Sequence, residues 1–334
     1  MTRIRRLAIG LGALVLTGGL VVVTTTTAVA EPDQRRGTVV ATSLAKGPRP
    51  MVAYLEGRRL HLPSGAVQTL PFTKSHARGL SLLGPSPRGW VVIDTTGLTA
   101  KLFRVRGGTA TRFWSVGDHS SYSWRLGVNG KRVIQLYVDR AAYSVASVFD
   151  LDGRNRKTMR FNGYGSVLAF TGDRAVVSAN KTWDWVIGSP KSAVSDDSSQ
   201  AADIRKNLLF VKAPGDAYGP TSLGLPGAAD WGAEFLPRQV STDGSYVVGY
   251  SYDTKRIQVR DMVNGALVRS IRTQHPWGSP IFWESDTKLM FVVKTSLGRA
   301  LVRCAVTGPC KRATAWVPRG RRITVSFQQE YFGQ

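Results

Sequence analysis

Cysteine is almost absent from this chain of 334 residues. The two that occur, Cys304 and Cys310, stand six positions apart in LVRCAVTGPCKRAT (301–314). A structural zinc site takes four ligands, and no histidine stands near this pair. Redox motifs place two residues between their cysteines, whereas five stand here. These absences exclude the usual cysteine chemistry and leave a disulfide, provided that the chain reaches an oxidising compartment.

Histidine is scarce as well, and hydrolase motifs are missing. None of the four histidines stands within metal-ligand spacing of another: His61, His76, His119 and His275. No Gly-x-Ser-x-Gly nucleophile elbow occurs, and no sialidase-type Ser-x-Asp-x-Gly-x-x-Trp box. The sequence therefore assigns no catalytic residue, and it favours a non-enzymatic protein over an enzyme.

Acidic residues cluster only weakly. The segment DLDGRNRKT (150–158) places Asp150, Asp152 and Asn155 near one turn, which raises the question of calcium. Basic residues follow at once, and no acid stands at the twelfth position of a calcium loop. We interpret the segment as a hairpin turn and expect neither a metal nor another cofactor.

The first thirty residues have the pattern of a secretory signal peptide. Arg3, Arg5 and Arg6 precede an uncharged stretch, and Ala28-Val29-Ala30 provides a small-x-small cleavage site. The alternative is an uncleaved anchor, because the apolar core 7–23 is only just long enough to span a bilayer. Export predicts a protein that is secreted or associated with the cell envelope, where the Cys304–Cys310 disulfide would persist.

Positive charge dominates. Lys and Arg number 45 against 22 Asp and Glu, a net charge of +23, and removal of the three signal arginines leaves +20 (23 − 3). Outside a cell the obvious polyanions are wall polymers and membrane surfaces. The basic residues are spread along the chain, which favours an arginine-rich surface over a dedicated polyanion site. Nucleic acid is an unlikely partner, because no binding motif accompanies the charge.

Short apolar runs recur along the mature chain, and no stretch shows convincing helical periodicity. Gly, Pro, Asn and Asp bound the runs, which is the pattern of strands and turns. Their starts are separated by roughly 32 to 43 residues, a recurrence typical of a β-propeller. The eight runs are 51–55, 90–94, 132–138, 175–179, 207–211, 246–250, 289–293 and 323–327. We expect each of them to be the inner strand of a blade.

One interval has the complete pattern of strands and turns that forms a meander. In STDGSYVVGYSYDTKRIQVRDMVNGALVRSI (241–271), Asp243-Gly244 turns into a strand, and Thr254-Lys255 turns the chain back. Asn264-Gly265 is a strong two-residue hairpin turn, because both positions tolerate positive φ. This interval resembles the repeat of TolB-type and WD-repeat-like secreted bacterial β-propellers. The resemblance implies the fold and a tendency to bind other molecules, but it transfers no catalytic residue.

The domain organisation follows from these observations. We expect a signal peptide at 1–30, a polar lead-in at 31–46 and an all-β propeller domain at 47–334. Seven blades are predicted, with six as the alternative because the interval 180–206 is irregular. The last run would pair into the first blade, and such closure removes open sheet edges.

Two pairs of residues are candidates, one for a binding site and the other for a disulfide. The loop tryptophans Trp231 and Trp277 are the best candidates for a binding mouth, although any single tryptophan is more often packed between blades. Cys304 and Cys310 flank Thr307-Gly308-Pro309, so a disulfide there would staple the outer hairpin of the last full blade.

Taken together, the sequence predicts a secreted, non-enzymatic β-propeller that acts as a binding scaffold at the bacterial cell envelope. Its partners would be a protein, a glycan or an anionic wall or membrane polymer, and the membrane itself only if the N-terminal segment stays uncleaved. The alternative is a carbohydrate-active hydrolase or lyase at the propeller's centre, which requires paired carboxylates there. The oligomeric state stays open.

Overall fold

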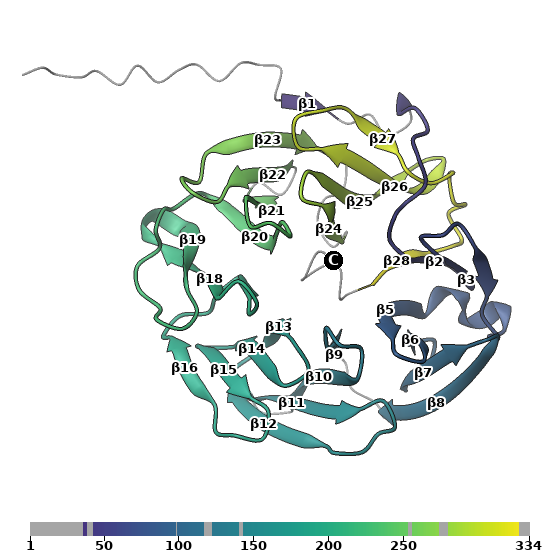
Figure 1. Cartoon of the computed structure of the whole chain (residues 1–334), viewed down its shortest axis with the longest axis horizontal. Coiled ribbons are helices and arrows are strands. Elements are labelled where there is room, and N and C mark those ends of the chain that lie inside the picture. Colours follow the sequence, from purple (N-terminus) through teal and green to yellow (C-terminus); the bar gives the residue numbers. More distant parts are fainter. Residues whose placement is uncertain are drawn as a thin grey trace, which may run out of the picture. The chain divides into compact units, whose positions relative to one another are not determined.

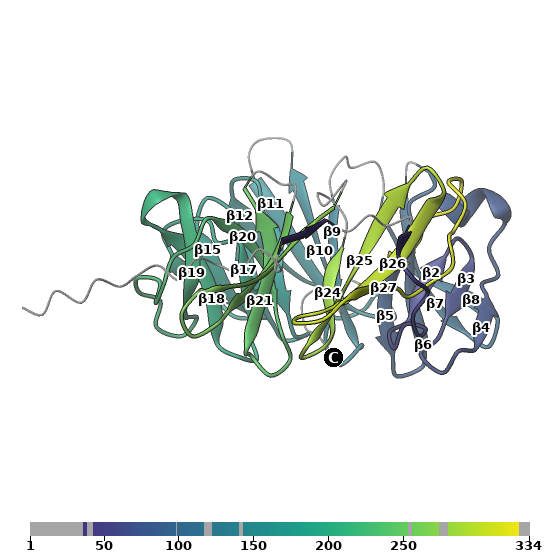
Figure 2. The same ribbon diagram turned by 90° about the horizontal axis from the view of Figure 1, so that it is seen from above.

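The computed structural model describes residues 36–38, 43–97, 99–116, 122–139, 143–252, 256–273 and 280–326. These residues belong to one compact unit of seven small sheets. Figure 1 shows the sheets as blades around a common axis, and Figure 2 shows the same ring from its side. The fold is an all-β, seven-bladed propeller, which decides between the predicted seven blades and six. The predicted signal peptide lies outside the described residues, and within them no helix could cross a membrane.

Each blade is an antiparallel meander, numbered here in chain order. Blade 1 contains β2 (Tyr54–Glu56), β3 (Arg59–His61) and β4 (Val67–Thr69), with β28 (Ile323–Val325) innermost. Blade 2 contains β5 (Leu80–Ser86), β6 (Gly89–Asp94), β7 (Ala100–Arg106) and β8 (Thr109–Val116). Blade 3 contains β9 (Tyr122–Leu126), β10 (Arg132–Asp139), β11 (Tyr143–Asp150) and β12 (Lys157–Asn162). Blade 4 contains β13 (Ser166–Phe170), β14 (Arg174–Ser178), β15 (Thr182–Val186) and β16 (Ser192–Ser195).

Blades 5, 6 and 7 complete the ring. Blade 5 contains β17 (Ala201–Asp203), β18 (Leu208–Ala213) and β19 (Ala217–Ser222). Blade 6 contains β20 (Phe235–Val240), β21 (Tyr246–Ser251), β22 (Arg256–Asp261) and β23 (Leu267–Arg272). Blade 7 contains β24 (Ile281–Ser285), β25 (Lys288–Thr295), β26 (Gly298–Ala305) and β27 (Cys310–Arg312). Two 3-10 turns, η3 (Lys74–Arg78) and η4 (Pro214–Asp216), lie between strands.

The apolar runs occupy the second strand of each blade, so their predicted inner position was wrong for seven of the eight runs. Only the last run, as β28, is innermost. The true inner strands escape a period-2 pattern because four of them carry register shifts against the second strand. The shifts fall at Leu82/Gly84, Val167/Ala169, Pro237/Gln239 and Trp283/Ser285. Such bulges interrupt the alternation by which sequence analysis finds a strand.

Ring closure is confirmed. β28 pairs antiparallel with β2, in the register Tyr54↔Val325 and Glu56↔Ile323. The strand also bonds forward to blade 2, where the Ser326 hydroxyl donates to the Leu83 carbonyl at 2.7 Å. The last strand of the chain thereby fills the inner position that the N-terminal part of blade 1 leaves open.

A buried ion pair ties the chain entering blade 1 to blade 7. Glu284 on β24 binds Arg303 on β26, with side chains that are 1% and 11% exposed. The Met51 amide donates to Glu284 Oε1 at 2.7 Å. The Arg303 guanidinium also donates to the carbonyls of Pro48 and Arg49, at 3.0 and 2.9 Å. Each nitrogen of the guanidinium and both oxygens of the carboxylate therefore have a hydrogen-bond partner.

The polar lead-in adds strands to the outer edges of the last two blades. β1 (Arg36–Thr38) pairs parallel with β23, and Lys46 forms a parallel bridge with Arg312. The core itself lies between blades, where large side chains such as Trp283 and Trp185 are fully buried. Trp283 crosses to blade 6, because its Nε1 donates to the Gln239 carbonyl at 3.1 Å.

The substitution Arg303→Ala is expected to lower the free energy of unfolding by about 3–5 kcal/mol, because it leaves Glu284 buried without its partner. Urea unfolding followed by tryptophan fluorescence measures this loss. The matched control is Lys181→Ala, which breaks the exposed Lys181–Asp196 pair and should leave the midpoint nearly unchanged. Equal effects of the two substitutions would contradict the role assigned to Arg303.

Candidate functional site

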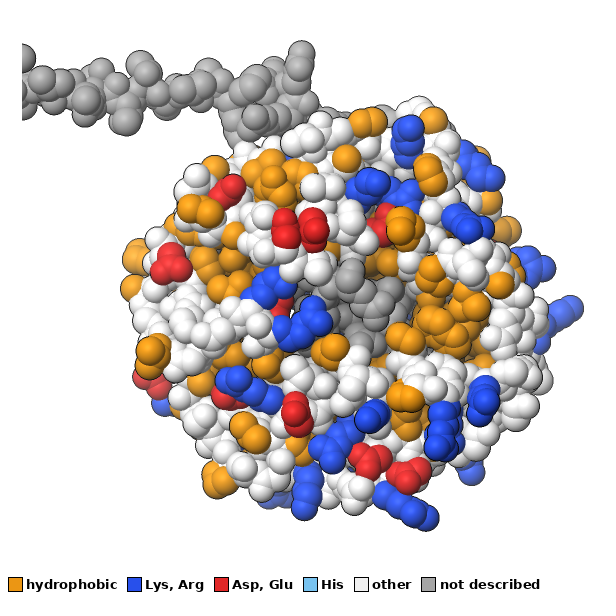
Figure 3. Space-filling model, viewed as in Figure 1, with side chains coloured by type: hydrophobic (Ala, Val, Ile, Leu, Met, Phe, Trp, Pro, Cys, Tyr) orange, Lys and Arg blue, Asp and Glu red, His pale blue; other side chains and the backbone are white. Residues whose placement is uncertain are grey.

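A cavity of about 670 Å³ opens where blades 2, 3 and 4 meet. In a meander, the turns between strands one and two and between strands three and four lie at the same end of the sheet. We call the face of the ring that carries these turns the turn face; Figures 1 and 3 look onto it. The cavity is lined by Ser86, Pro87, Arg88, Arg104, Asn129, Gly130, Lys131, Arg132, Asp150, Leu151, Asp152, Gly172 and Asp173.

The β9–β10 turn positions Lys131 at this cavity. Gly130 has φ +65, and a Cβ there would lie 2.6 Å from the Pro85 carbonyl oxygen. Only glycine combines that backbone conformation with such a close approach. The Asn129 side chain then accepts the Lys131 amide at 2.9 Å, which fixes the residue that carries the cation.

Arg88 and Arg104 come from blade 2. The β5–β6 turn is closed by the Ser86 hydroxyl, which donates to the Gly89 carbonyl at 3.1 Å, and Arg88 is exposed at its tip. Arg104 lies near the end of β7, and its side chain is half-buried. Three cations from three separate segments therefore converge on one cavity.

The acidic residues of the lining already have partners. Asp150 accepts from Arg132 Nε at 2.9 Å and from Asn155 Nδ2 at 2.6 Å. Asp152 accepts the Arg154 amide at 2.9 Å. These bonds agree with the interpretation of residues 150–158 as a hairpin turn.

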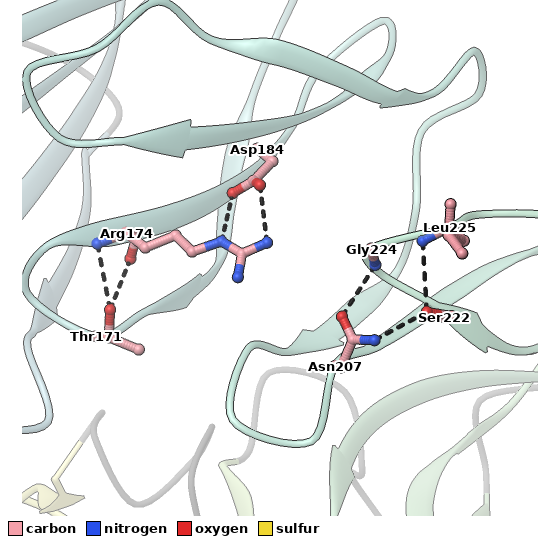
Figure 4. Close-up of polar contacts among 7 residues, drawn as sticks. All are labelled: Thr171, Arg174, Asp184, Asn207, Ser222, Gly224 and Leu225. Carbon is pink, nitrogen blue, oxygen red and sulfur yellow. Dashed lines mark hydrogen bonds and ion pairs between the residues drawn. The ribbon is translucent and has the colours of Figure 1, made fainter.

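The blade 4 side of the cavity is braced in the same way (Figure 4). Thr171 donates its hydroxyl to Asp173 at 2.6 Å and receives the Arg174 amide at 3.2 Å. Arg174 forms two parallel bonds of 2.8 Å to Asp184, and this pairing raises the pKa of the arginine. Figure 4 also shows Asn207 of the next blade holding a loop through Ser222 and Gly224.

The lining has four basic residues against three acidic ones, so positive charge is in surplus by one (4 − 3). In the part of the chain that the structure describes, Arg88, Arg104 and Lys131 form no ion pair. Unpaired like charges held in one place destabilise a fold slightly, and such local violations are expected at functional sites. Figure 3 shows blue Lys and Arg side chains spread around the turn face, with fewer red acidic side chains among them.

Elsewhere, hydrogen bonds and burial explain the shifted pKa values of three further groups. The pKa of Glu56 is lowered by its hydrogen bond with His61, with a further contribution from Arg321, and burial raises the pKa of Tyr54 to about 12. Burial also lowers the pKa of Lys191, whose ammonium lies over the rings of Phe161 and Trp183. These groups lie within blades or at seams, away from the cavity.

Of the two tryptophans that were predicted to form a binding mouth, the structure describes Trp231. Trp231 packs against Phe235, with ring centroids 6.2 Å apart, and donates its Nε1 to the Met262 carbonyl at 2.9 Å. Its ring also lies directly against Gly265 of the predicted hairpin turn. Trp231 therefore contacts Phe235, Met262 and Gly265. That it also forms part of a binding mouth stays a prediction. Trp277 lies outside the described residues.

Two histidines are described, and each contacts a carboxylate. His76 Nδ1 bonds the buried Asp94 at 2.5 Å, and His61 Nε2 lies 3.4 Å from Glu56. His119 and His275 lie outside the described residues. No group of three or more potential metal ligands occurs among the residues that the structure describes.

Arg88, Arg104 and Lys131 were not predicted from the sequence as a site. The only local signal of Arg88 and Lys131 is a basic residue beside a turn, in SPRGW and VNGKR, and Arg104 stands within the strand AKLFRVR. That signal is frequent in a chain with 45 basic residues, so it becomes informative only once the strands are assigned to blades.

The structure joins Cys304 to Cys310 by a disulfide. The two residues face each other across β26 and β27, the outer hairpin of blade 7. The Arg269 guanidinium donates to Cys310 Sγ at 3.3 Å and to the carbonyls of Ala305 and Gly308, and burial lowers its pKa. Blade 6 is thereby bound to the stapled hairpin.

Comparison with known proteins agrees with the fold. No protein-family model matches the chain, and no curated protein matches it significantly. Among solved structures it is similar to Hsv2 from Kluyveromyces marxianus, with 12% identity, 77% of this chain and 92% of that chain covered, and a TM-score of 0.54. The AfRom2 CNH domain is similar at 10% identity, with 82% and 98% covered and a TM-score of 0.53.

TolB from Acinetobacter baumannii also aligns, at 10% identity over 84% of this chain and 64% of that chain, with a TM-score of 0.46. At these identities the first two structures establish the propeller fold. They do not distinguish a TolB-type repeat from other propeller repeats.

Replacing both cysteines by alanine is expected to lower the free energy of unfolding by about 2 kcal/mol, because the unfolded chain then loses a short covalent loop. Urea unfolding of the double variant measures the change. A thiol assay on the native protein provides the companion test, and two reactive thiols there would contradict the assigned disulfide.

Proposed function

We propose that this protein is an exported, non-enzymatic propeller that binds anionic polymers of the bacterial envelope through its turn face. The observation that carries the proposal is the convergence of Arg88, Arg104 and Lys131, unpaired within the described residues, on one cavity. Nearby carboxylates are hydrogen-bonded to their own neighbours, whereas the three cations form no ion pair within the described residues.

The surrounding charge supports the same partner. With +20 (23 − 3) on the chain without its signal peptide, the protein's field attracts a polyanion from a distance and raises its local concentration at the surface. A polymer with repeated charges can contact the cavity and other cations at once, so weak individual contacts add up to useful avidity.

Export is supported by the sequence of the first thirty residues and agrees with the disulfide. A disulfide persists outside the cytosol, where thiol-reducing systems do not remove it. The Cys304–Cys310 bond therefore suits a chain that works at the envelope or beyond it.

Sedimentation of the chain beginning at Glu31 with purified bacterial cell wall tests the proposal. Binding is expected at low salt and should weaken strongly at high salt, because exposed charges are screened. The triple substitution R88A/R104A/K131A should weaken binding roughly 100-fold, at about 1 kcal/mol for each cation near an anionic surface.

The matched control is K74A/R78A/R319A, which removes the same charge from exposed positions outside the cavity. It should reduce binding far less than the cavity variant. Absence of binding at low salt, or equal losses in the two variants, would overturn the assignment of the cavity as the binding site.

A further inference from the structure

We infer that the cavity recognises phosphoryl groups, carried by a phosphodiester-linked polyol or sugar polymer, rather than carboxylates. The inference rests on the proposed function and specifies its ligand. It follows from the kind and number of the hydrogen-bonding groups that line the cavity and from the separate segments that carry them.

Donors reach the cavity from three segments of the chain. Arg88 lies in the β5–β6 turn, Arg104 on β7, and Lys131 in the β9–β10 turn. Asn129 adds a fourth donor, because its amide oxygen accepts the Lys131 backbone amide and its NH₂ group is left over. A ligand must therefore accept hydrogen bonds from several sides.

This arrangement suits a tetrahedral anion better than a planar one. A carboxylate has two oxygens in one plane, and a single guanidinium can satisfy both by two parallel bonds, as Arg174 does with Asp184. The phosphorus of a phosphodiester is tetrahedral, with two free oxygens and two ester oxygens, so its acceptors lie outside a single plane and suit donors that come from more than one segment. Arginine forks match phosphate oxygens as they match those of a carboxylate, so the preference for a phosphoryl group rests on the number of segments that supply donors.

The cavity is also large enough for the carbon skeleton of such a ligand, and part of its lining is apolar. Its volume of about 670 Å³ lies within the usual range for small-molecule sites and far exceeds one phosphate ion. Pro87 and Leu151 supply apolar lining, and Gly130 and Gly172 add no side chain that would fill the space.

The acidic residues at the rim complete the match. Asp152 and Asp173 are exposed, and a carboxylate accepts several hydrogen bonds beyond the one from its own neighbour. They can accept from the hydroxyl groups of a polyol or sugar. A molecule that has phosphoryl acceptors at one end and hydroxyl donors at the other therefore fits both parts of the lining.

Isothermal titration of the chain beginning at Glu31 with glycerol 3-phosphate and with glycerate tests the inference. The two probes share a hydroxylated three-carbon frame and differ in the anion. Glycerol 3-phosphate is expected to bind at least about tenfold more tightly. R88A/R104A/K131A should lose that binding, whereas K74A/R78A/R319A should keep it. Thermal unfolding of each variant verifies that the propeller is intact.

The charge-conserving variant R88K/R104K separates geometry from charge. It should weaken glycerol 3-phosphate binding several-fold, because lysine lacks the planar fork, and it should retain salt-dependent wall binding. Equal affinities for the two probes, or phosphate binding that survives R88A/R104A/K131A, would overturn the inference. Wall binding without phosphate preference would overturn the inference alone, whereas phosphate preference without wall binding would overturn the proposed function alone.

Discussion

The pairing of β28 with β2 closes the ring of seven blades. It brings the last described strand of the chain into the first blade, so that no blade lacks an inner strand. The same strand continues its bonds into blade 2 through Ser326 and Thr324. Since the cavity lies among the turns of blades 2, 3 and 4, the closed ring determines where its cations stand.

Charge serves two different purposes in this molecule. Glu284 and Arg303 are buried and fully bonded, and they hold the incoming chain against blade 7. Arg88 and Lys131 are exposed at turns and have no acidic partner within the described chain. The first arrangement stabilises the fold because its partners are fixed. The second leaves donors unused, which is the property that a binding surface needs.

The sequence predicted the fold well because the second strands are continuous apolar runs with regular spacing, and the run at 323–327 marked the closure. It misplaced these runs as inner strands because the bulges at Leu82/Gly84 and Trp283/Ser285 hide the true ones. It could not predict the cavity, since Arg88, Arg104 and Lys131 share no motif and meet only through the packing of blades. The disulfide was predictable because both cysteines belong to one hairpin.

Urea unfolding of a chain that ends at Arg322 tests whether ring closure by β28 holds the propeller together. A chain that ends at Ser326 retains β28 and is the matched control. The shorter chain is expected to lose the single cooperative transition and to self-associate, because β2 then exposes an unpaired edge. A cooperative transition at the same midpoint in both chains would contradict that expectation.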